Sequence, residues 1–359
     1  MKRLLPSPRV KPEDNLRSVD DSFREAGLMR NRRTSPVGVT TRLRAKRQEA
    51  AAKDELTGAA PMPLVSGNGV SLLRVPAWRD QKAVSKWLWH GFSTRRGGAS
   101  RAYCPEGAPG ELNLGFTASD DREAVAQNRR LLAEAVTGDR EMPLVALRQF
   151  HSNMVIQVSA ADSGREKPWK ADGAITAESG MLIAIQTADC IPVLVADKRR
   201  RVVGAFHAGW RGTVKRIVEL GVGRMRLEFG SQPEDLIAAI GPGMGQCCYE
   251  VGEELVSEFE SQFCYGRELF REVFDSDPVR KKYPMLFLTQ RAPGHSQLGP
   301  SLHLDLIEAN RRQLLDAGVK ASAISVTGGC TGCDPELFFS HRTSRGHAGR
   351  MMSVIGIRG

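Results

Sequence analysis

Three apolar segments near the middle of the chain set the strongest limit on its fold. They cover residues 181–186, 191–196 and 202–206, and only short polar breaks separate them. Continuous apolar runs of this length are typical of strands that are buried on both faces. Their direct succession predicts a sheet at the centre of the protein, with other elements covering it.

Further strand and helix patterns surround these segments. Strands are expected at residues 89–93, 144–147, 155–158, 174–176, 236–240, 324–326 and 352–357. Helices are expected at residues 119–134, 213–228, 250–263 and 303–315. Because some strands alternate with helices and others follow one another directly, the pattern predicts a mixed α/β layered domain, not a plain doubly wound sheet.

Composition separates residues 1–60 from the rest of the chain. This segment holds 14 Lys and Arg residues against 8 Asp and Glu residues, so it carries over half of the formal net charge of +10. It shows no sustained apolar periodicity, which predicts a disordered basic extension over residues 1–62 and a folded domain over residues 63–359. Such an extension can contact nucleic acid or anionic lipid. We expect a solvated tail instead, and no nucleic-acid partner.

Hydropathy and cysteine content indicate the cellular compartment. No apolar run approaches the roughly 20 residues that span a bilayer, so no membrane partner is expected. The N-terminal segment also lacks the apolar region of a secretory signal. Seven cysteines, an odd number, favour a reducing compartment in which thiols serve as ligands or nucleophiles. We therefore expect a cytoplasmic protein. An oligomer is compatible with the sequence but is not predicted by it.

One cysteine and two histidines are the strongest candidates for a functional site. Cys190 and His207 lie at the ends of predicted buried strands, and His151 lies between two others. Functional residues gather where rigid strands end in loops. A thiolate and two imidazoles suit Zn²⁺, which keeps a fourth coordination position open in catalytic sites. The sequence therefore makes His151, Cys190 and His207 candidate zinc ligands.

Three other interpretations of these residues remain open. Buried cysteine is common, so a plain thiol with two ordinary histidines is the first of them. In the second, Cys190 is a nucleophile and His207 is its base, with Asp189 orienting the histidine and no metal. In the third, the same three side chains bind copper. The chain has no H-x-H pair of the kind that holds a multi-copper cluster, which favours zinc over copper.

Four other cysteines form a second and weaker pattern. Cys330 and Cys333 have the C-x-x-C spacing of half a zinc site, whereas Cys247 and Cys248 are adjacent in the chain. Adjacent cysteines are a poor second half for such a site. The spacing therefore favours turn thiols near the functional site over a structural zinc site with four cysteine ligands.

Basic and glycine-rich segments are candidates for anion binding. Residues 94–100 (TRRGGAS) are expected to form a turn in which Arg95 and Arg96 could hold an anion. Gly97 and Gly98 would let the backbone of this turn approach a ligand closely. Residues 241–245 (GPGMG) fit a tight turn better than a phosphate-binding loop. Arg211 lies close to His207 in the chain and is the strongest candidate for binding a phosphate or carboxylate. The neighbouring Trp210 either stacks on a planar ligand or packs in the core.

Nine motifs, taken together and in this order, resemble one known family. They are STRRGG (residues 93–98), LNLG (112–115), RQFHS (148–152), ADGAIT (171–176), TADCIPVLVAD (187–197), HAGWRG (207–212), AAIGPGMGQCCYEVGEE (238–254), HLDLIEANRRQL (303–314) and CTGCDPELFFSHR (330–342). The set is similar to the laccase-domain or polyphenol oxidase family. Members of that family are also described as purine nucleoside phosphorylases and, in bacteria, as a peptidoglycan editing factor.

This resemblance implies a fold, a metal and a chemistry. The implied fold is a single four-layer α/β/β/α domain with mixed sheets. The implied ligands of Zn²⁺ are again His151, Cys190 and His207. The implied partners are phosphate and purine nucleosides, with adenosine, inosine, guanosine and methylthioadenosine as candidate substrates. The implied reactions are phosphorolysis of the nucleoside and deamination of adenosine by metal-activated water.

Further residues take candidate roles from the same resemblance. Arg95 and Arg211 are candidates for catalytic contact with phosphate or substrate, and Asn113 and Trp210 are candidates for substrate binding. The chemistry also needs a general acid for the leaving base, which the resemblance does not name, and Asp189, the residue before Cys190, is one candidate for it.

Departures from the family pattern and two alternative functions accompany the resemblance. Ser152 stands where the family usually has glycine, Gly243 stands where it usually has cysteine, and the insertion at residues 270–300 is longer than usual. One alternative is a metal-free cysteine hydrolase of peptidoglycan editing that uses Cys190 and His207. The other is a copper-dependent polyphenol oxidoreductase. Asp172 is a second candidate for the catalytic acid.

Overall fold

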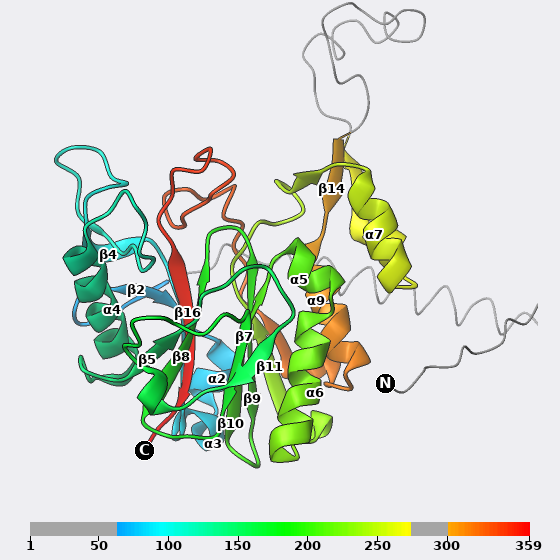
Figure 1. The fold of residues 1–359 in the computed structure, drawn as a ribbon, viewed down its shortest axis with the longest axis horizontal. Coiled ribbons are helices and arrows are strands. Elements are labelled where there is room, and N and C mark those ends of the chain that lie inside the picture. The colour runs from blue at the N-terminus through cyan, green and yellow to red at the C-terminus, as the bar shows by residue number, and fades with distance from the viewer. Residues whose placement is uncertain (1–62, 274–300) are drawn as a thin grey trace, which may run out of the picture. The chain divides into compact units, whose positions relative to one another are not determined.

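Two six-stranded sheets pack face to face at the centre of the protein (Figure 1). They are seen in a computed structural model, which describes residues 63–273 and 301–359. The predicted disordered extension and residues 274–300 of the predicted insertion lie outside the described residues. None of the described helices is long and apolar enough to cross a membrane.

The first sheet contains six strands in the order β1-β2-β3-β16-β8-β5. Their bounds are β1 Leu64–Val65, β2 Ser71–Leu73, β3 Leu88–Ser93, β16 Met351–Ile357, β8 Met181–Thr187 and β5 Leu144–Ala146. Strands β5 and β8 run parallel, and the other neighbours run antiparallel.

The second sheet has the order β15-β11-β9-β10-β7-β6. Its strands are β15 Ile324–Val326, β11 Leu236–Ile240, β9 Ile191–Asp197, β10 Val202–Ala208, β7 Gly173–Thr176 and β6 Val155–Gln157. The pairs β6–β7 and β11–β15 are parallel, whereas β9 pairs antiparallel with both β10 and β11. Both sheets are therefore mixed, as the sequence predicted.

Helices cover the outer faces of both sheets. Helix α4 (Arg122–Thr137) packs on the first sheet, while α6 (Ile217–Phe229) and α9 (Leu306–Asp316) pack on the second (Figure 1). Shorter helices are α2 (Pro76–Asp80), α3 (Lys82–Ser85), α5 (Trp210–Val214) and α7 (Glu254–Gln262). A small third sheet joins β12 (Glu250–Val251), β14 (Ser301–Leu304) and β13 (Phe270–Val273). The order of layers is α/β/β/α, which confirms the expected fold.

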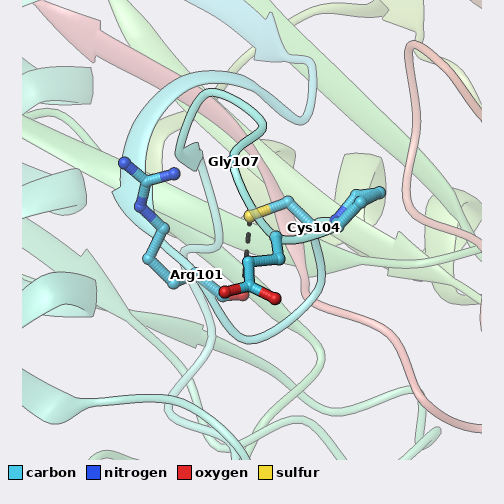
Figure 2. A pocket seen from close by; sticks show the side chains of 5 residues that line it. Arg101, Cys104 and Gly107 are labelled. Atoms are coloured by element: carbon cyan, nitrogen blue, oxygen red, sulfur yellow. Dashed lines mark hydrogen bonds between the residues drawn. The ribbon is translucent and has the colours of Figure 1, made fainter.

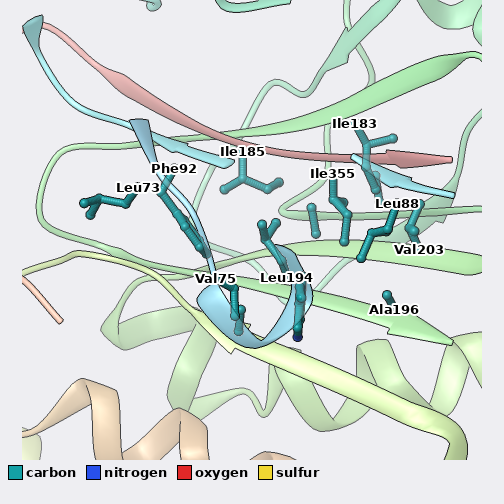
Figure 3. Close-up of a cluster of buried hydrophobic side chains, with 14 of the residues drawn as sticks. Leu73, Val75, Leu88, Phe92, Ile183, Ile185, Leu194, Ala196, Val203 and Ile355 are labelled. Atoms are coloured by element: carbon teal, nitrogen blue, oxygen red, sulfur yellow. The ribbon is translucent and has the colours of Figure 1, made fainter. Parts of the chain in front are cut away.

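Alternating side chains explain why the central segments are apolar throughout. On β8, Ile183 and Ile185 point between the two sheets, whereas Leu182 and Ala184 face helix α4. Strand β9 divides in the same way, with Leu194 between the sheets (Figure 3). Each strand buries both of its faces, so no polar alternation is left in the sequence.

Several predicted boundaries were wrong because local backbone geometry overrides the apolar pattern. The helix expected at residues 213–228 is two helices, since Arg216 takes a left-handed conformation with φ of 60° between α5 and α6. The helix expected from residue 303 begins only at Leu306, where the Asp305 side chain accepts a hydrogen bond from the Glu308 N–H at 2.8 Å. His303 belongs to strand β14 instead.

Two further segments differ from their predicted structure. Residues 250–263 begin as strand β12, and helix α7 covers only the later part. The segment predicted as a turn at residues 94–100 contains strand β4 (Arg96–Ser100). A Cβ atom at Gly97 or Gly98 would overlap the backbone near Gly69 or Glu111, so these glycines admit the protein's own chain and not a ligand.

Two connections from the first sheet to the second lie at the same end of the sandwich, where β15 also leads back to β16 of the first sheet. Strand β5 leads into β6 through the loop that contains His151, and β8 leads into β9 through the loop that contains Cys190. Because β5 and β8 are parallel neighbours, both loops leave the first sheet at one edge. The β9–β10 turn at residues 198–201 is exposed and lies at the opposite end of these strands.

Strand β3 buries a histidine whose ionisation is coupled to folding. The side chain of His90 is 4% exposed, and its Nε2 accepts a hydrogen bond from the Val75 N–H at 3.0 Å. Burial, reinforced by the neighbouring Arg74 guanidinium, lowers the pKa of His90 to about 3. His90 is therefore neutral in the folded protein at every pH at which the protein is normally handled.

We predict that acid destabilises the protein in part through His90. Between pH ~6.5 and the folded-state pKa, the unfolded chain binds a proton at this histidine and the folded chain does not. The free energy of unfolding should therefore fall by up to about 1.4 kcal/mol per pH unit from this group as the pH is lowered. Urea unfolding of wild type and His90→Gln at pH 7, 6 and 5 measures the difference. Equal pH slopes in the two proteins would contradict the assignment.

Candidate metal centre

Three side chains from three elements converge where the chain crosses between the sheets. The ligand atoms of His151, Cys190 and His207 all lie within 4.8 Å of one another. The Cys190 Sγ lies 3.7 Å from the His151 Nε2. The two imidazole rings are 5.0 Å apart between centroids and meet at 64°. The structure thus brings together the three residues that the sequence selected.

Each of the three residues is placed by a different local feature. His207 lies near the end of strand β10, where it pairs with Pro192 of β9. Cys190 immediately precedes β9 and is partly buried. His151 is exposed and has a left-handed backbone with φ of 63°, a conformation that is uncommon for any residue other than glycine. Such strain persists only where surrounding contacts hold it.

The buried carboxylate of Asp172 supplies those contacts. It accepts hydrogen bonds from the backbone N–H groups of Phe150 at 3.2 Å, His151 at 3.0 Å and Ser152 at 2.7 Å. The Ser152 hydroxyl donates a further bond at 2.6 Å, and the His207 Nδ1 lies 2.8 Å from Asp172 Oδ1. One carboxylate therefore fixes both the His151 loop and the ring of His207.

These bonds determine the ionisation of Asp172. Its burial opposes a charge, but the hydrogen bonds from His207 and Ser152 outweigh burial and lower the pKa of Asp172 to about 2. At neutral pH the group is an ionised acceptor and has no proton to give to a leaving base. Its contacts make Asp172 a positioning residue.

The hydrogen bond to Asp172 also selects the free nitrogen of His207. With Nδ1 bonded to a carboxylate, Nε2 remains to face Cys190 and His151. Burial resists charge on both partners, yet the pKa of Cys190 is lowered to about 6 by His207 and His151. The pKa of His207 is raised to about 9 by Cys190 and Asp172. The site thus favours a thiolate.

The donor set and its spacing fit a zinc ion. Tetrahedral zinc with Zn–S of ~2.3 Å and Zn–N of ~2.0 Å places sulfur and nitrogen ligands roughly 3.6 Å apart. The separation of 3.7 Å between Cys190 Sγ and His151 Nε2 agrees with that geometry. The carboxylate–histidine pair of Asp172 and His207 is the support that metal-bound histidines usually have.

Gly209 leaves space for this cluster. A Cβ atom at this position would lie 2.8 Å from the Cys190 Sγ and 2.9 Å from the His151 Cδ2. Both distances are too short for unbonded atoms, so any larger residue would displace two of the three candidate ligands. Position 209 of the HAGWRG motif requires glycine because no side chain fits there. Its backbone conformation is one that any residue can adopt.

Asp189 joins the cluster to the C-terminal part of the chain. Its Oδ1 accepts a hydrogen bond from the Thr331 hydroxyl at 2.7 Å, and its Oδ2 accepts one from the Arg342 N–H at 2.8 Å. Its backbone carbonyl accepts a third bond from the Met244 N–H at 2.7 Å. Asp189 has a left-handed φ of 97° that these contacts hold in place. Both carboxylate oxygens are already occupied.

Arg95 and Asn113 are also engaged within the protein. The Arg95 guanidinium forms an ion pair with Glu111 at 2.6 Å and lies 4.7 Å from the centre of the Phe339 ring. Asn113 is fully buried, and its amide bonds to Asp120, to the backbone N–H of Arg350 and to Gly115. A substrate would have to displace these contacts to reach either side chain.

Trp210 and Arg211 begin helix α5 immediately after the cluster. Trp210 is partly buried and packs against the core of the second sheet. The Arg211 side chain is exposed, and its guanidinium carbon lies 4.2 Å from the centre of the Trp210 ring. Among residues 63–273 and 301–359, no acidic side chain forms an ion pair with Arg211. Its charge is therefore available to an anionic ligand.

Sequence reasoning missed three residues close to this site. Burial and the negative charge of Cys190 raise the pKa of Tyr249 to about 12, so its hydroxyl stays protonated. The Arg342 guanidinium lies 5.2 Å from the centre of the Tyr249 ring. Phe150, next to His151, leaves 49% of its surface exposed. The sequence shows only that an aromatic residue precedes His151, and the exposure that makes Phe150 a candidate contact appears in the structure alone.

A separate hollow lies on the loop that follows β4 (Figure 2). It is lined by Arg101, Cys104, Pro105, Glu106 and Gly107. The Cys104 thiol points to the Arg101 carbonyl, 3.4 Å away. None of the candidate site residues lines this hollow, which has no metal-binding group of the kind found around Cys190.

Comparison with known proteins gives one family and several close relatives. Residues 89–358 match the family described as "Multi-copper polyphenol oxidoreductase laccase". A protein of Geobacillus stearothermophilus named "Purine nucleoside phosphorylase YlmD" is 36% identical over 274 residues, which cover 75% of this chain and 89% of that protein. "Adenosine deaminase RL5", from an unknown prokaryotic organism, is 32% identical over 270 residues, covering 74% of this chain and 92% of its own length.

A solved structure has the same fold. The crystal structure of the hypothetical protein YfiH from Bacillus licheniformis matches with a TM-score of 0.67 and 29% sequence identity. The match covers 82% of this chain and 99% of that chain. The four-layer arrangement is therefore shared over the whole length of that protein.

We predict that Gly209→Ala weakens metal binding without unfolding the protein. The added methyl group displaces Cys190 and His151, so zinc affinity measured by competition with a chelating dye should fall at least ~10-fold. Gly223→Ala is the matched control, because a Cβ atom at that exposed position in α6 has no neighbour within 4 Å. The control should retain zinc affinity and gain about 0.5–1 kcal/mol in the free energy of unfolding. Equal zinc affinity in both variants would contradict the geometry described for Gly209.

A second prediction concerns the hydrogen bonds of Asp172. Asp172→Asn keeps the size of the side chain but turns one acceptor into a donor, so the bonds from His207 and Ser152 cannot all be kept. We expect zinc affinity to fall by ~10–100-fold. Ser152→Ala removes only the hydroxyl bond and should have a smaller effect, which isothermal titration with zinc can compare. A larger loss in Ser152→Ala than in Asp172→Asn would overturn the assigned role.

Proposed function

The chain belongs to the multi-copper polyphenol oxidoreductase laccase family, and we propose that it is a zinc-dependent purine nucleoside phosphorylase that also deaminates adenosine. Membership confirms the resemblance inferred from the motifs. The proposed substrates are adenosine, inosine, guanosine and methylthioadenosine, with phosphate as the second substrate. The names of two relatives support both activities.

The convergence of His151, Cys190 and His207 is the observation that carries this proposal. Three protein ligands with nitrogen and sulfur donors are the usual set for catalytic zinc. Bound zinc supplies a Lewis acid and lowers the pKa of a bound water to ~7. Asp172 holds His207 and the His151 loop in place, so the ligands are positioned before the ion arrives.

Arg211 is the proposed contact for phosphate. Its guanidinium is exposed, follows His207 by four residues and carries no ion pair within the described part of the chain. A guanidinium binds phosphate oxygens through two parallel hydrogen bonds. Arg342 is a second cation close by, because its guanidinium lies 5.2 Å from the centre of the Tyr249 ring and both Arg342 and Arg211 act on the ionisation of Tyr249. Phosphate held there would lie close to the residues around Cys190.

Aromatic side chains are the proposed contacts for the purine. Phe150 is about half exposed beside His151. A purine offers a flat apolar face that stacks well on such a ring. Trp210 is partly buried, which favours packing, and its free edge remains a second candidate. The protonated hydroxyl of Tyr249 is a proposed donor to the substrate.

Asp189 and Arg95 are proposed to position the site and not to contact the reacting atoms. Both oxygens of Asp189 accept hydrogen bonds from Thr331 and Arg342. Arg95 is paired with Glu111. To act as the catalytic acid, as the sequence suggested, Asp189 would first have to break its hydrogen bonds. To bind phosphate, Arg95 would first have to leave Glu111.

A metal-free cysteine hydrolase is the second candidate, and one geometric observation favours it. Cys190, His207 and Asp172 form a series in which a thiol, an imidazole and a carboxylate follow one another. A nucleophile, its base and a group that orients the base are arranged in this order in cysteine hydrolases. Such an enzyme would act on amide bonds and would need no metal.

One assay separates these proposals. Purified protein is incubated with each of the four nucleosides, with and without phosphate, after its metal content has been measured. We predict one zinc ion that depends on Cys190, phosphate-dependent release of the free base, and phosphate-independent conversion of adenosine to inosine. Cys190→Ala should lose more than ~100-fold in both rates, because a ligand contributes more than the residues that support it.

Cys104→Ser is the matched control, since this thiol lines the hollow of Figure 2 and belongs to neither group of candidate metal ligands. It should retain both rates. Full nucleoside activity in metal-free wild type would end the zinc proposal. Amide hydrolysis that resists chelators and stops on thiol alkylation would support the cysteine hydrolase. Bound copper with oxidation of phenols would instead support the polyphenol oxidoreductase named by the family.

A further inference from the structure

Four cysteines outside the candidate metal centre gather into a second cluster. The sulfur atoms of Cys247, Cys248, Cys330 and Cys333 all lie within 4.8 Å of one another. The Sγ of Cys333 is 3.3 Å from the Sγ of Cys247 and equally 3.3 Å from that of Cys248. Cys247 and Cys333 are exposed, and the other two are partly buried. The cluster is therefore accessible to an ion from solvent.

Backbone contacts hold the two loops that carry these cysteines. The Thr331 N–H donates to the Gly243 carbonyl at 2.9 Å, next to a parallel bridge between Gly243 and Cys330. In the first loop, the N–H groups of Cys248 and Tyr249 both donate to the Gly245 carbonyl at 3.0 Å. This tight turn directs two adjacent thiols to one side. Turn geometry thus makes adjacent cysteines a usable half of a metal site.

Two glycines leave room for the four sulfur atoms, and one backbone hydrogen bond reaches a sulfur directly. A Cβ atom at Gly332 would lie 3.0 Å from the Cys248 Sγ, and one at Gly245 would lie 3.3 Å from the Cys247 Sγ. The Gly245 N–H donates to the Cys330 Sγ at 3.2 Å. Backbone N–H groups that point at sulfur stabilise the thiolate, the form of cysteine that binds metal.

The spacing of the sulfur atoms identifies what they can bind. A tetrahedral ion with Zn–S bonds of ~2.3 Å has sulfur ligands about 3.8 Å apart. The two separations from Cys333 are 3.3 Å, somewhat shorter than this, and all four sulfurs lie within 4.8 Å of one another, so a small outward shift would admit the ion. A disulfide would use two sulfurs only, whereas Cys333 is equally close to two partners. A cluster of several irons places its own sulfides between the metals and needs its cysteines farther apart. Four thiolates around one ion are typical of structural zinc.

We propose that Cys247, Cys248, Cys330 and Cys333 bind one structural zinc ion, separate from the ion at the candidate metal centre. The ion closes two loops that both contact Asp189. Met244 of the first loop donates to the Asp189 carbonyl, and Thr331 of the second donates to the Asp189 carboxylate. The tetrathiolate site thereby fixes the strained residue that precedes Cys190.

Metal content of the full chain tests this proposal. Wild type, purified with reductant and excess zinc, should contain about two zinc ions per chain after gel filtration. Cys333→Ser should lose one of them, and Cys190→Ala should lose the other. Cys264→Ser is the matched control, because this exposed thiol lies outside the cluster, and it should keep the full content. Each variant removes a ligand of one site only, so zinc lost in Cys333→Ser supports this proposal whether or not the proposed function holds.

A measurement on wild type covers the case in which the cysteine variant does not fold. Metal-free wild type is titrated with Co²⁺, and thiolate-to-cobalt charge-transfer absorption is followed. Two binding steps are expected, one of them with the strong absorption of four thiolates. A single step removed by Cys190→Ala would overturn the proposal. So would unchanged zinc content in Cys333→Ser, or a disulfide between Cys333 and Cys247 or Cys248 in wild type kept under reductant.

Discussion

The candidate site depends on one fully buried carboxylate. Asp172 has no exposed surface, and burying its charge is favourable only because five hydrogen-bond donors surround it. Four of the donors belong to the loop of His151, and the fifth is the ring of His207. These two elements lie at the end where the chain crosses between the sheets. The fold brings the β5–β6 and β8–β9 loops to the same end of the two sheets. The Asp172 carboxylate then fixes the positions of the His151 loop and the His207 ring at that end.

Much of the fold could be predicted because the central strands bury both faces. The apolar run that became β8 has no polar position, since its side chains alternate between the inter-sheet core and the α4 layer. Helix boundaries were less accessible. Nothing in the apolar periodicity around Arg216 indicates the left-handed residue that separates α5 from α6. The polar Asp305 that caps α9 was read as part of a helix, because a capping role depends on where its side chain points.

The same division holds for the site. Residue type and position at strand ends were enough to select His151, Cys190 and His207. The engagement of Arg95 with Glu111 and of Asn113 with Asp120 could not be predicted, because these partners meet only through tertiary contacts. The cysteine cluster was undervalued for a related reason. The spacing of two cysteines along the chain shows whether their thiols point the same way only when the backbone between them is regular. In a tight turn, two adjacent cysteines can direct their thiols to the same side, as Cys247 and Cys248 do.

The exposed β9–β10 turn is a possible attachment point for a charged support. Its four residues, 198–201, are all basic, and the Asp197 carboxylate anchors the turn by accepting two backbone hydrogen bonds. Strand β9 spans seven residues, so the turn lies about 20 Å from Cys190. In a chain shortened by the basic residues 1–60, adsorption on a polyanionic support through this turn would favour an orientation with the Cys190 end toward the solution. Immobilisation could then proceed without chemical coupling and without covering the end where ligands are expected to enter.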